Sequence, residues 1–189
     1  MSPILKGVVA SQITGHLNPY ATGSYESIQT ISVGSNVQTV QFTSIPQTYK
    51  HLEIRGFTRD TYTNTYPGIY ATIGGSSGTF NYMGGDGGGG VGGVGGAVSA
   101  YTGNSVGNDQ TAGNYMPMII RIPDYTNTSR IKMMNNMLAH SSNGATNTVS
   151  FWTWSSGSTA AVTDVLFGEG DTNFKLMPGS HWALYGIKG

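Results

Sequence analysis

The sequence predicts an all-β protein: an antiparallel β-sandwich of jelly-roll-like topology preceded by an extended N-terminal arm. Segments rich in Val, Ile, Thr, Phe and Tyr alternate with clusters of Gly, Asn, Ser and Pro along the 189 residues. No window has the 3.6-residue apolar period of a helix. About ten or eleven short strands are expected, without the helical crossovers that parallel sheets require.

Residues 1–24 are predicted to form the arm, and residues 25–189 a single sandwich domain. Prolines and glycines interrupt the arm at Pro3, Gly7, Gly15, Pro19 and Gly23. Such frequent interruption disfavours a packed element. The apolar runs of this segment are too short for a signal peptide or a membrane span, so no membrane insertion is expected.

The first two strands are expected at Ile28–Val33 and Val37–Ile45, joined into a hairpin by a Gly-Ser-Asn turn. In Tyr49–Arg59, apolar residues alternate with charged ones, which predicts one apolar and one solvated face. Further strands are expected at Gly68–Ile73, Gly78–Met83, Ala97–Tyr101, Tyr115–Ile122, Arg130–Leu138, Thr148–Trp154, Ala161–Phe167, Phe174–Met177 and His181–Ile187.

One strand has an especially clear apolar face. Met116, Met118, Ile120 and Ile122 recur at every second position. Successive side chains of a strand point to opposite faces, so these four should enter the core. Arg121 should point outwards.

Residues 84–96 contain ten glycines in thirteen positions. Glycine loses more backbone entropy on ordering than any other residue, which favours a loop here. Extended polyglycine strands packed against neighbouring subunits are the alternative interpretation.

The charge balance limits the classes of partner. Charged residues make up 10% of the chain, and nine basic residues offset nine acidic ones. Without a net positive field, nucleic-acid binding is disfavoured. A net charge near zero removes the mutual repulsion that keeps free monomers apart, which suits a subunit of an assembly, and a closed homo-oligomer, a trimer, is expected.

Tests for chemistry find no catalytic, cofactor or metal site, so the chain is not expected to be an enzyme. The stretch Gly74–Gly78 matches the G-x-S-x-G nucleophile pattern, but the following residues read as a strand rather than a helix. The four histidines lack the spacing of a zinc site, and there is no cysteine. Glu169, Asp171 and Asn173 alternate like calcium ligands, but Phe174 stands where the loop requires glycine.

Four aromatic residues are candidate contacts for a glycan or for a neighbouring subunit. Trp152 and Trp154 are two positions apart and share one face of their strand. Tyr62 and Tyr66 lie among Thr, Asn, Pro and Gly, a composition typical of recognition loops. For the tryptophans the core of the sandwich is the alternative position, and for the tyrosines it is surface decoration without a ligand.

Four segments carry a resemblance to a known group of proteins. They are MSPILKGVVAS at residues 1–11, Ser44–Asp60, DYTNTSRIK at Asp124–Lys132 and HWALYGIKG at His181–Gly189. With them the chain resembles small structural proteins of tailed bacteriophages of aquatic bacteria, including cyanophages. The resemblance implies a virion protein assembled in the host cytoplasm, either a head decoration or cement protein or a tail-fibre subunit. Its partners would be other capsid or tail proteins and, for a fibre adhesin, a host surface glycan.

Overall fold

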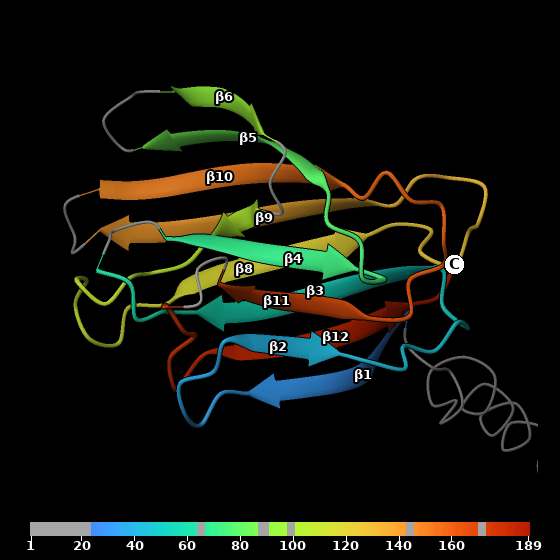
Figure 1. Ribbon diagram of the computed structural model, residues 1–189, viewed down its shortest axis with the longest axis horizontal. Helices are drawn as coiled ribbons and strands as arrows, with labels where there is room; N and C mark the ends of the chain where they lie inside the picture. The colour runs from blue at the N-terminus through green and yellow to red at the C-terminus, as the bar shows by residue number, and fades with distance from the viewer. Residues whose placement is uncertain (1–23, 64–66, 87–90, 98–100, 143–145, 170–172) are drawn as a thin grey trace, which may run out of the picture.

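The computed structural model describes residues 24–63, 67–86, 91–97, 101–142, 146–169 and 173–189, and these contain strands and no helix. In chain order the strands are β1 (Tyr25–Ser32), β2 (Thr39–Phe42), β3 (His51–Thr58), β4 (Gly68–Ile73), β5 (Thr79–Asp86), β6 (Val91–Ala97), β7 (Tyr101–Asn104), β8 (Met116–Ile122), β9 (Met133–Ser142), β10 (Thr146–Ser155), β11 (Val165–Glu169) and β12 (His181–Ile187). They form two antiparallel sheets packed face to face, which confirms the predicted β-sandwich (Figure 1).

The strand order is that of a jelly roll with two inserted hairpins. The large sheet has the order β1-β12-β3-β8-β9-β10-β5-β6, and the small sheet has the order β2-β11-β4-β7. Without the hairpins β5–β6 and β9–β10, the first strand pairs with the last, the second with the next to last, and so on inwards. This nesting is a long hairpin wrapped into two layers. Both inserted hairpins extend the large sheet alone.

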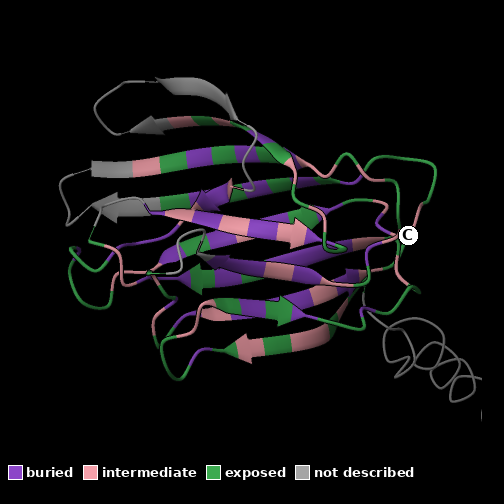
Figure 2. Ribbon diagram, in the orientation of Figure 1, coloured by how far each residue is buried: buried purple, intermediate pink, exposed green. Residues whose placement is uncertain are grey.

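The core lies between the two sheets and is supplied largely by alternate residues of the strands whose burial is described, as the colours of Figure 2 show. Met116, Met118, Ile120 and Ile122 are all buried and Arg121 is exposed, as predicted. Across the layers, Trp182 of β12 stacks on Phe167 of β11 with ring centroids 4.7 Å apart. Gly56 makes room for this indole, because a Cβ there would lie 2.9 Å from a Trp182 ring carbon.

The expected hairpin of the first two strands is wrong. β1 pairs with β12 in the large sheet, whereas β2 pairs with β11 in the small one. The two strands place their apolar residues on opposite walls of the core, so each is more stable in its own layer. A bulge between Ser27 and Gln29 lets both Ile28 and Ile31 of β1 pack on the core despite their odd spacing.

The expected loop at residues 84–96 is wrong for most of its length. β5 continues to Asp86, and the glycine-rich β6 pairs with it as the edge strand of the large sheet. Hydrogen bonds of the ladder offset the entropy that the glycines lose. Residues 87–90 lie outside the described part of the chain.

Several other boundaries differ from the prediction. Phe174–Met177 forms no strand and contributes only isolated bridges at Leu176. The strand expected at Ala97–Tyr101 begins at Tyr101, and that expected at Ala161–Phe167 begins at Val165. Of the predicted arm, residues 1–23 lie outside the described residues, so the structure begins at Ser24.

Candidate attachment site

One end of the sandwich, here called the arm end, carries the residue from which the N-terminal segment departs. The main-chain N–H of Lys188 donates a hydrogen bond to the carbonyl of Ser24 over 3.0 Å. Tyr25 and His51 both pair with Ile187 in the sheet, so β1 and β3 begin where β12 ends. The first described residue therefore lies beside the C-terminus of the chain (Figure 1).

Three segments that are far apart in sequence, residues 44–60, 124–132 and 181–189, meet at the arm end. The hydroxyl of Tyr125, from the loop after β8, donates a hydrogen bond to the carbonyl of Pro46. The main-chain N–H of Asp124 donates to Nδ1 of His51 over 3.0 Å. Gly186 of β12 lies under the ring of Tyr49, and a Cβ at this position would approach that ring to 2.3 Å. These contacts fix the segments against one another.

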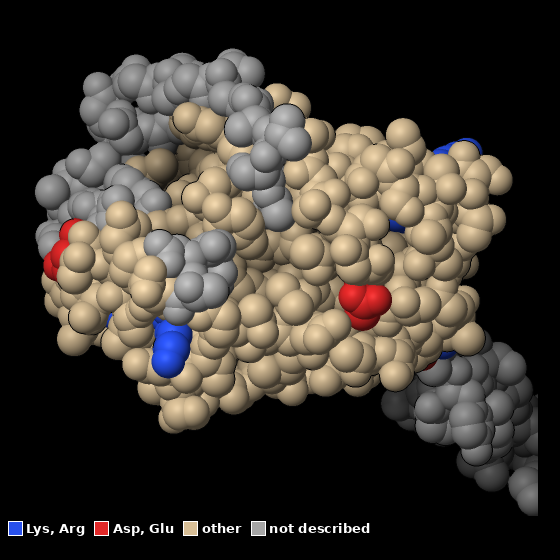
Figure 3. Space-filling view, viewed as in Figure 1, with Lys and Arg blue, Asp and Glu red and all other residues tan. Residues whose placement is uncertain are grey.

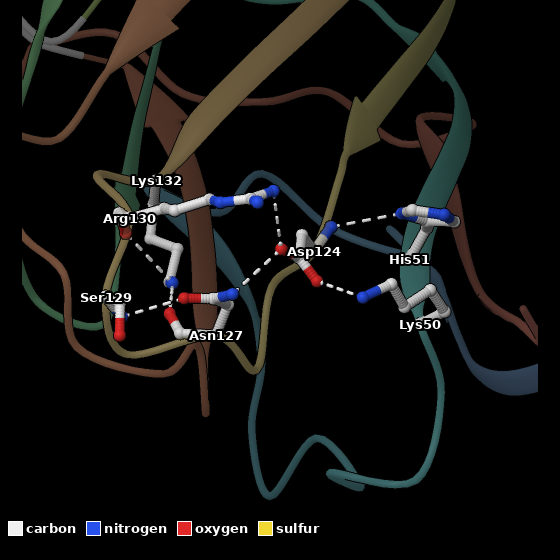
Figure 4. Close-up of polar contacts among 7 residues, drawn as sticks. All are labelled: Lys50, His51, Asp124, Asn127, Ser129, Arg130 and Lys132. Carbon is white, nitrogen blue, oxygen red and sulfur yellow. Dashed lines mark hydrogen bonds and ion pairs between the residues drawn. The ribbon is translucent and has the colours of Figure 1, made fainter.

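Asp124 is the centre of a polar network at this end (Figure 4). Its carboxylate accepts from Lys50 Nζ at 2.5 Å, from Asn127 Nδ2 at 3.0 Å and from Arg130 at 3.3 Å. Its φ of 50° is in the left-handed region, which Asp tolerates better than most residues. The hydrogen bond from Lys50 is the main reason why the pKa of Asp124 lies below its usual value.

The same loop encloses a buried lysine. Lys132 is 2% exposed, and its ammonium group donates to the carbonyls of Asn127 and Arg130. Burial lowers the pKa of Lys132, while the charge of Asp124 acts in the opposite direction. The carbonyls of Asn127 and Arg130 are thus both bound to one buried ammonium group, which stabilises the loop between β8 and β9.

A second polar contact ties β1 to the C-terminus. Glu26 accepts hydrogen bonds from the hydroxyl of Tyr49 at 2.8 Å and from Nζ of Lys188 at 2.5 Å. The hydrogen bond to Glu26 raises the pKa of Tyr49. The first strand is therefore held from both sides at the point where the chain enters the domain.

The candidate contact residues expected from the sequence do not form one site. Trp152 and Trp154 are 7% and 1% exposed, so the face that they share is the core face, and the prediction that they offer it to a glycan is wrong. Strand alternation puts both indoles on one face but does not say which face is buried. Burying their large apolar area is favourable, so this face packs into the core. Tyr62 is partly buried, with its ring 3.9 Å from that of Phe174. Tyr66 lies outside the described residues.

Aromatic rings do gather where the small sheet ends and the large sheet continues. Tyr82 of β5 stacks on Trp152 at 4.8 Å, and Phe80 lies between Trp152 and Tyr101 of β7. Tyr101 in turn contacts Tyr70 of β4 at 4.1 Å. The rings cover the inner face of the inserted strands beside β7, so their first role is to close the core there.

The residues tested for chemistry lie in ordinary structural positions where they are described. Ser76 is in a tight turn after β4, with Gly74 and Gly75 at positive φ, and the chain then enters β5 rather than a helix. Within the described part of the chain, no cluster of three or more His, Asp or Glu side chains is placed to hold a metal ion. Nor does a membrane-spanning helix occur there.

Sequence reasoning missed the outward face of the inserted strands. Val149, Phe151, Met133, Met137 and Met83 are each more than two-fifths exposed on the large sheet. The signal was present, because β9 and β10 have apolar residues at consecutive positions and therefore on both faces.

No known protein family, curated protein or solved structure matches this chain.

Proposed function

We propose that the chain is a bacteriophage virion structural protein, a head decoration or cement protein or a short fibre subunit, displayed on the particle by its N-terminal segment. The observation that carries this proposal is the convergence at the arm end. The segments at 44–60, 124–132 and 181–189, which resemble such proteins, contact one another where residues 1–23 depart. Hydrogen bonds join these segments to one another at the point where the N-terminal segment meets the domain, so a force on that segment would act on the domain as a whole.

The fold supports the proposal by analogy. Jelly rolls recur in viral capsid proteins and in lectins, and the described strands have that topology. One fold serves many functions, so the proposal rests on the arm end, and the fold agrees with it.

The surface chemistry also agrees with a subunit of an assembly. Over the small sheet few charged side chains are exposed (Figure 3), and the exposed residues of β2 are Thr39 and Gln41. Contacts made through such a surface depend little on ion pairs, and salt screens them weakly. Attachment to other capsid or tail proteins is therefore expected to persist over a wide range of ionic strength.

A glycan-binding fibre adhesin is the alternative, and it has lost its main support. It rested on an exposed indole pair, and both indoles belong to the core. Partly buried tyrosines such as Tyr62 remain, but none of the described ones presents a flat aromatic platform together with the tryptophans.

Deletion of residues 1–23 tests the proposal. Ser24 is kept because its carbonyl accepts a hydrogen bond from Lys188. We expect the shortened chain to retain cooperative unfolding but to be absent from purified particles, as measured by mass spectrometry of virion proteins. As the matched control, a Gly/Ser segment of equal length replaces residues 1–23 and should also fail to incorporate. Incorporation of either variant at the level of the intact chain would refute attachment through this segment.

A further inference from the structure

The outer face of the large sheet carries a continuous apolar row across four neighbouring strands. Met83 of β5 is the register partner of Phe151 of β10, Phe151 that of Met137 of β9, and Met137 that of Ile119 of β8. The first three are 55%, 50% and 43% exposed, and Ile119 is partly exposed. Register partners lie side by side, so the four side chains form one strip.

The core does not need these side chains. It is filled by the alternate residues of the same strands, among them Trp152, Leu138 and Met118. The strand of the small sheet that contacts β5, β9 and β10 is β7, on their inner face. Within the described part of the chain, no element covers the strip.

A polar row borders the strip on one side, and its only charged member is Arg121. The adjacent row consists of Asn81, Thr153, Asn135 and Arg121, which are also register partners. On the other side, Val149 and Ala139 extend the apolar area. An apolar centre rich in Met and Phe with a polar rim is typical of protein–protein interfaces, where Lys and Glu are depleted. A sheet face that remains in water is normally polar.

The area that carries the strip is smaller than a standard interface but sufficient for a weak one. The strip crosses four strands, which lie about 4.8 Å apart and rise about 3.3 Å per residue, so with strands of about eight residues this area covers roughly 500 Å². A standard interface buries about 800 Å² on each partner, and weak, transient contacts lie below that size. We therefore expect pairing through this area to be reversible and to depend on concentration.

We propose that this face binds the same face of a second copy of the chain, with Phe151 near the centre. The strip and its polar rim are nearly uncharged, Arg121 at one end being the exception, and the chain has no net charge, so self-pairing meets little electrostatic repulsion. A flat patch that meets itself is isologous and gives a two-fold pair, in place of the trimer expected from the sequence. The pairing is independent of attachment to a particle.

The first test measures the mass of the intact chain by sedimentation equilibrium over a range of concentrations. We expect a monomer–dimer equilibrium, and Phe151→Asp should raise its dissociation constant by about 100-fold, because the substitution acts on both copies. Gln41→Glu, which adds a charge to the exposed face of β2, is the matched control and should leave the constant unchanged. A chain that is monomeric throughout, or trimeric, would overturn the proposal.

A second test keeps the proposal falsifiable if Phe151→Asp fails to fold. The chain has no cysteine, so Thr153→Cys and Gln41→Cys each introduce a single site for a spin label. In the paired chain, the distance between two Thr153 labels should be shorter than that between two Gln41 labels. The reverse order contradicts the proposal. So does a dimer that deletion of residues 1–23 abolishes and Phe151→Asp leaves intact, because the N-terminal segment would then be the contact.

Discussion

The two halves of the outer face of the large sheet differ in the side chains that they present to solvent. The half built from β1, β12, β3 and the end of β8 carries charges that are paired within the chain. The half built from the inserted strands β9, β10 and β5 carries exposed Met and Phe side chains. The first half pairs its charges internally and exposes Phe57 and Tyr25 singly, whereas the second half exposes a continuous apolar row.

Glu53 is the centre of the polar half. It is 1% exposed although it points away from the core, because Arg55 and Arg121 cover it, with contacts at 2.7 Å and 2.9 Å. Arg55 in turn lies over the rings of Tyr25 and Tyr185, 5.4 Å and 5.2 Å from their centroids. Burial alone would raise the pKa of Glu53, but the hydrogen bonds from Arg121 and Arg55 outweigh it and hold the pKa below its usual value.

The comparison shows where the exposed apolar row lies relative to the jelly-roll topology. The polar half belongs to the eight strands of the jelly roll, and the apolar half belongs mostly to the two hairpins inserted into it. The inserted hairpins need their inner residues for the core, so only their outer residues are available to a partner.

The largest loss of stability is expected from a substitution that weakens the packing of the inserted strands on the core. Trp154→Ala removes a buried indole and should lower the free energy of unfolding by about 3–5 kcal/mol. Hydrogen exchange should accelerate most in β10 and β5 and least in β12 and β3. Thr153→Ala, at the exposed neighbouring position, is the control. Equal acceleration in all strands would show that the two halves are not separate units of stability.

A smaller effect is expected from the polar half. Glu53→Gln keeps the shape but removes the charge, and should cost about 1–3 kcal/mol of unfolding free energy. A carboxylate whose pKa is lowered by folding contributes stability that is present above its unfolded pKa of about 4.3 and lost as the pH falls through the lower folded value. Urea titrations from neutral to acidic pH should therefore show that the variant loses less free energy of unfolding on acidification than the unsubstituted chain.

The control for this measurement is Glu26→Gln. Glu26 is more exposed than Glu53 and pairs with Lys188, whose side chain is 42% exposed. Glu26→Gln should therefore lower the free energy of unfolding by less than Glu53→Gln. If the Glu53 variant loses as much free energy of unfolding on acidification as the unsubstituted chain, this buried carboxylate does not govern the stability of its half.

The smallest effect on folding is expected in the apolar half. Met137→Thr replaces an exposed side chain by a good strand former and should change the free energy of unfolding by no more than about 0.5 kcal/mol. The measurement belongs in the Phe151→Asp background, where pairing does not add to stability. A loss of the size expected for Glu53→Gln would place Met137 among the residues that hold the monomer together.

The sequence predicts the parts of this fold that depend on local alternation. The bounds Gly68–Ile73 and His181–Ile187 agree with β4 and β12, and the inward series of β8 is confirmed. Strand pairing is decided by partners that are distant in sequence, so the expected hairpin of β1 and β2 was wrong. The strand in the glycine-rich region was missed because its stability comes from its ladder with β5 rather than from its side chains.

The candidate sites were harder to predict for a related reason. Alternation places Trp152 and Trp154 on one face but does not say which face is inside, and it marks Glu53 as solvated because the covering arginines come from two different strands. The network around Asp124 joins residues more than seventy positions apart. Such contacts exist only once the topology has brought the segments together.

A density map of the particle tests the central claim most directly. The account predicts that the sandwich lies on the outside with its arm end, marked by Tyr25 and the C-terminus, toward the capsid or tail. It also predicts that the strip around Phe151 faces the equivalent strip of a second copy. Absence of the chain from the particle, or an arm end that points into solvent with the strip uncovered, would contradict the account.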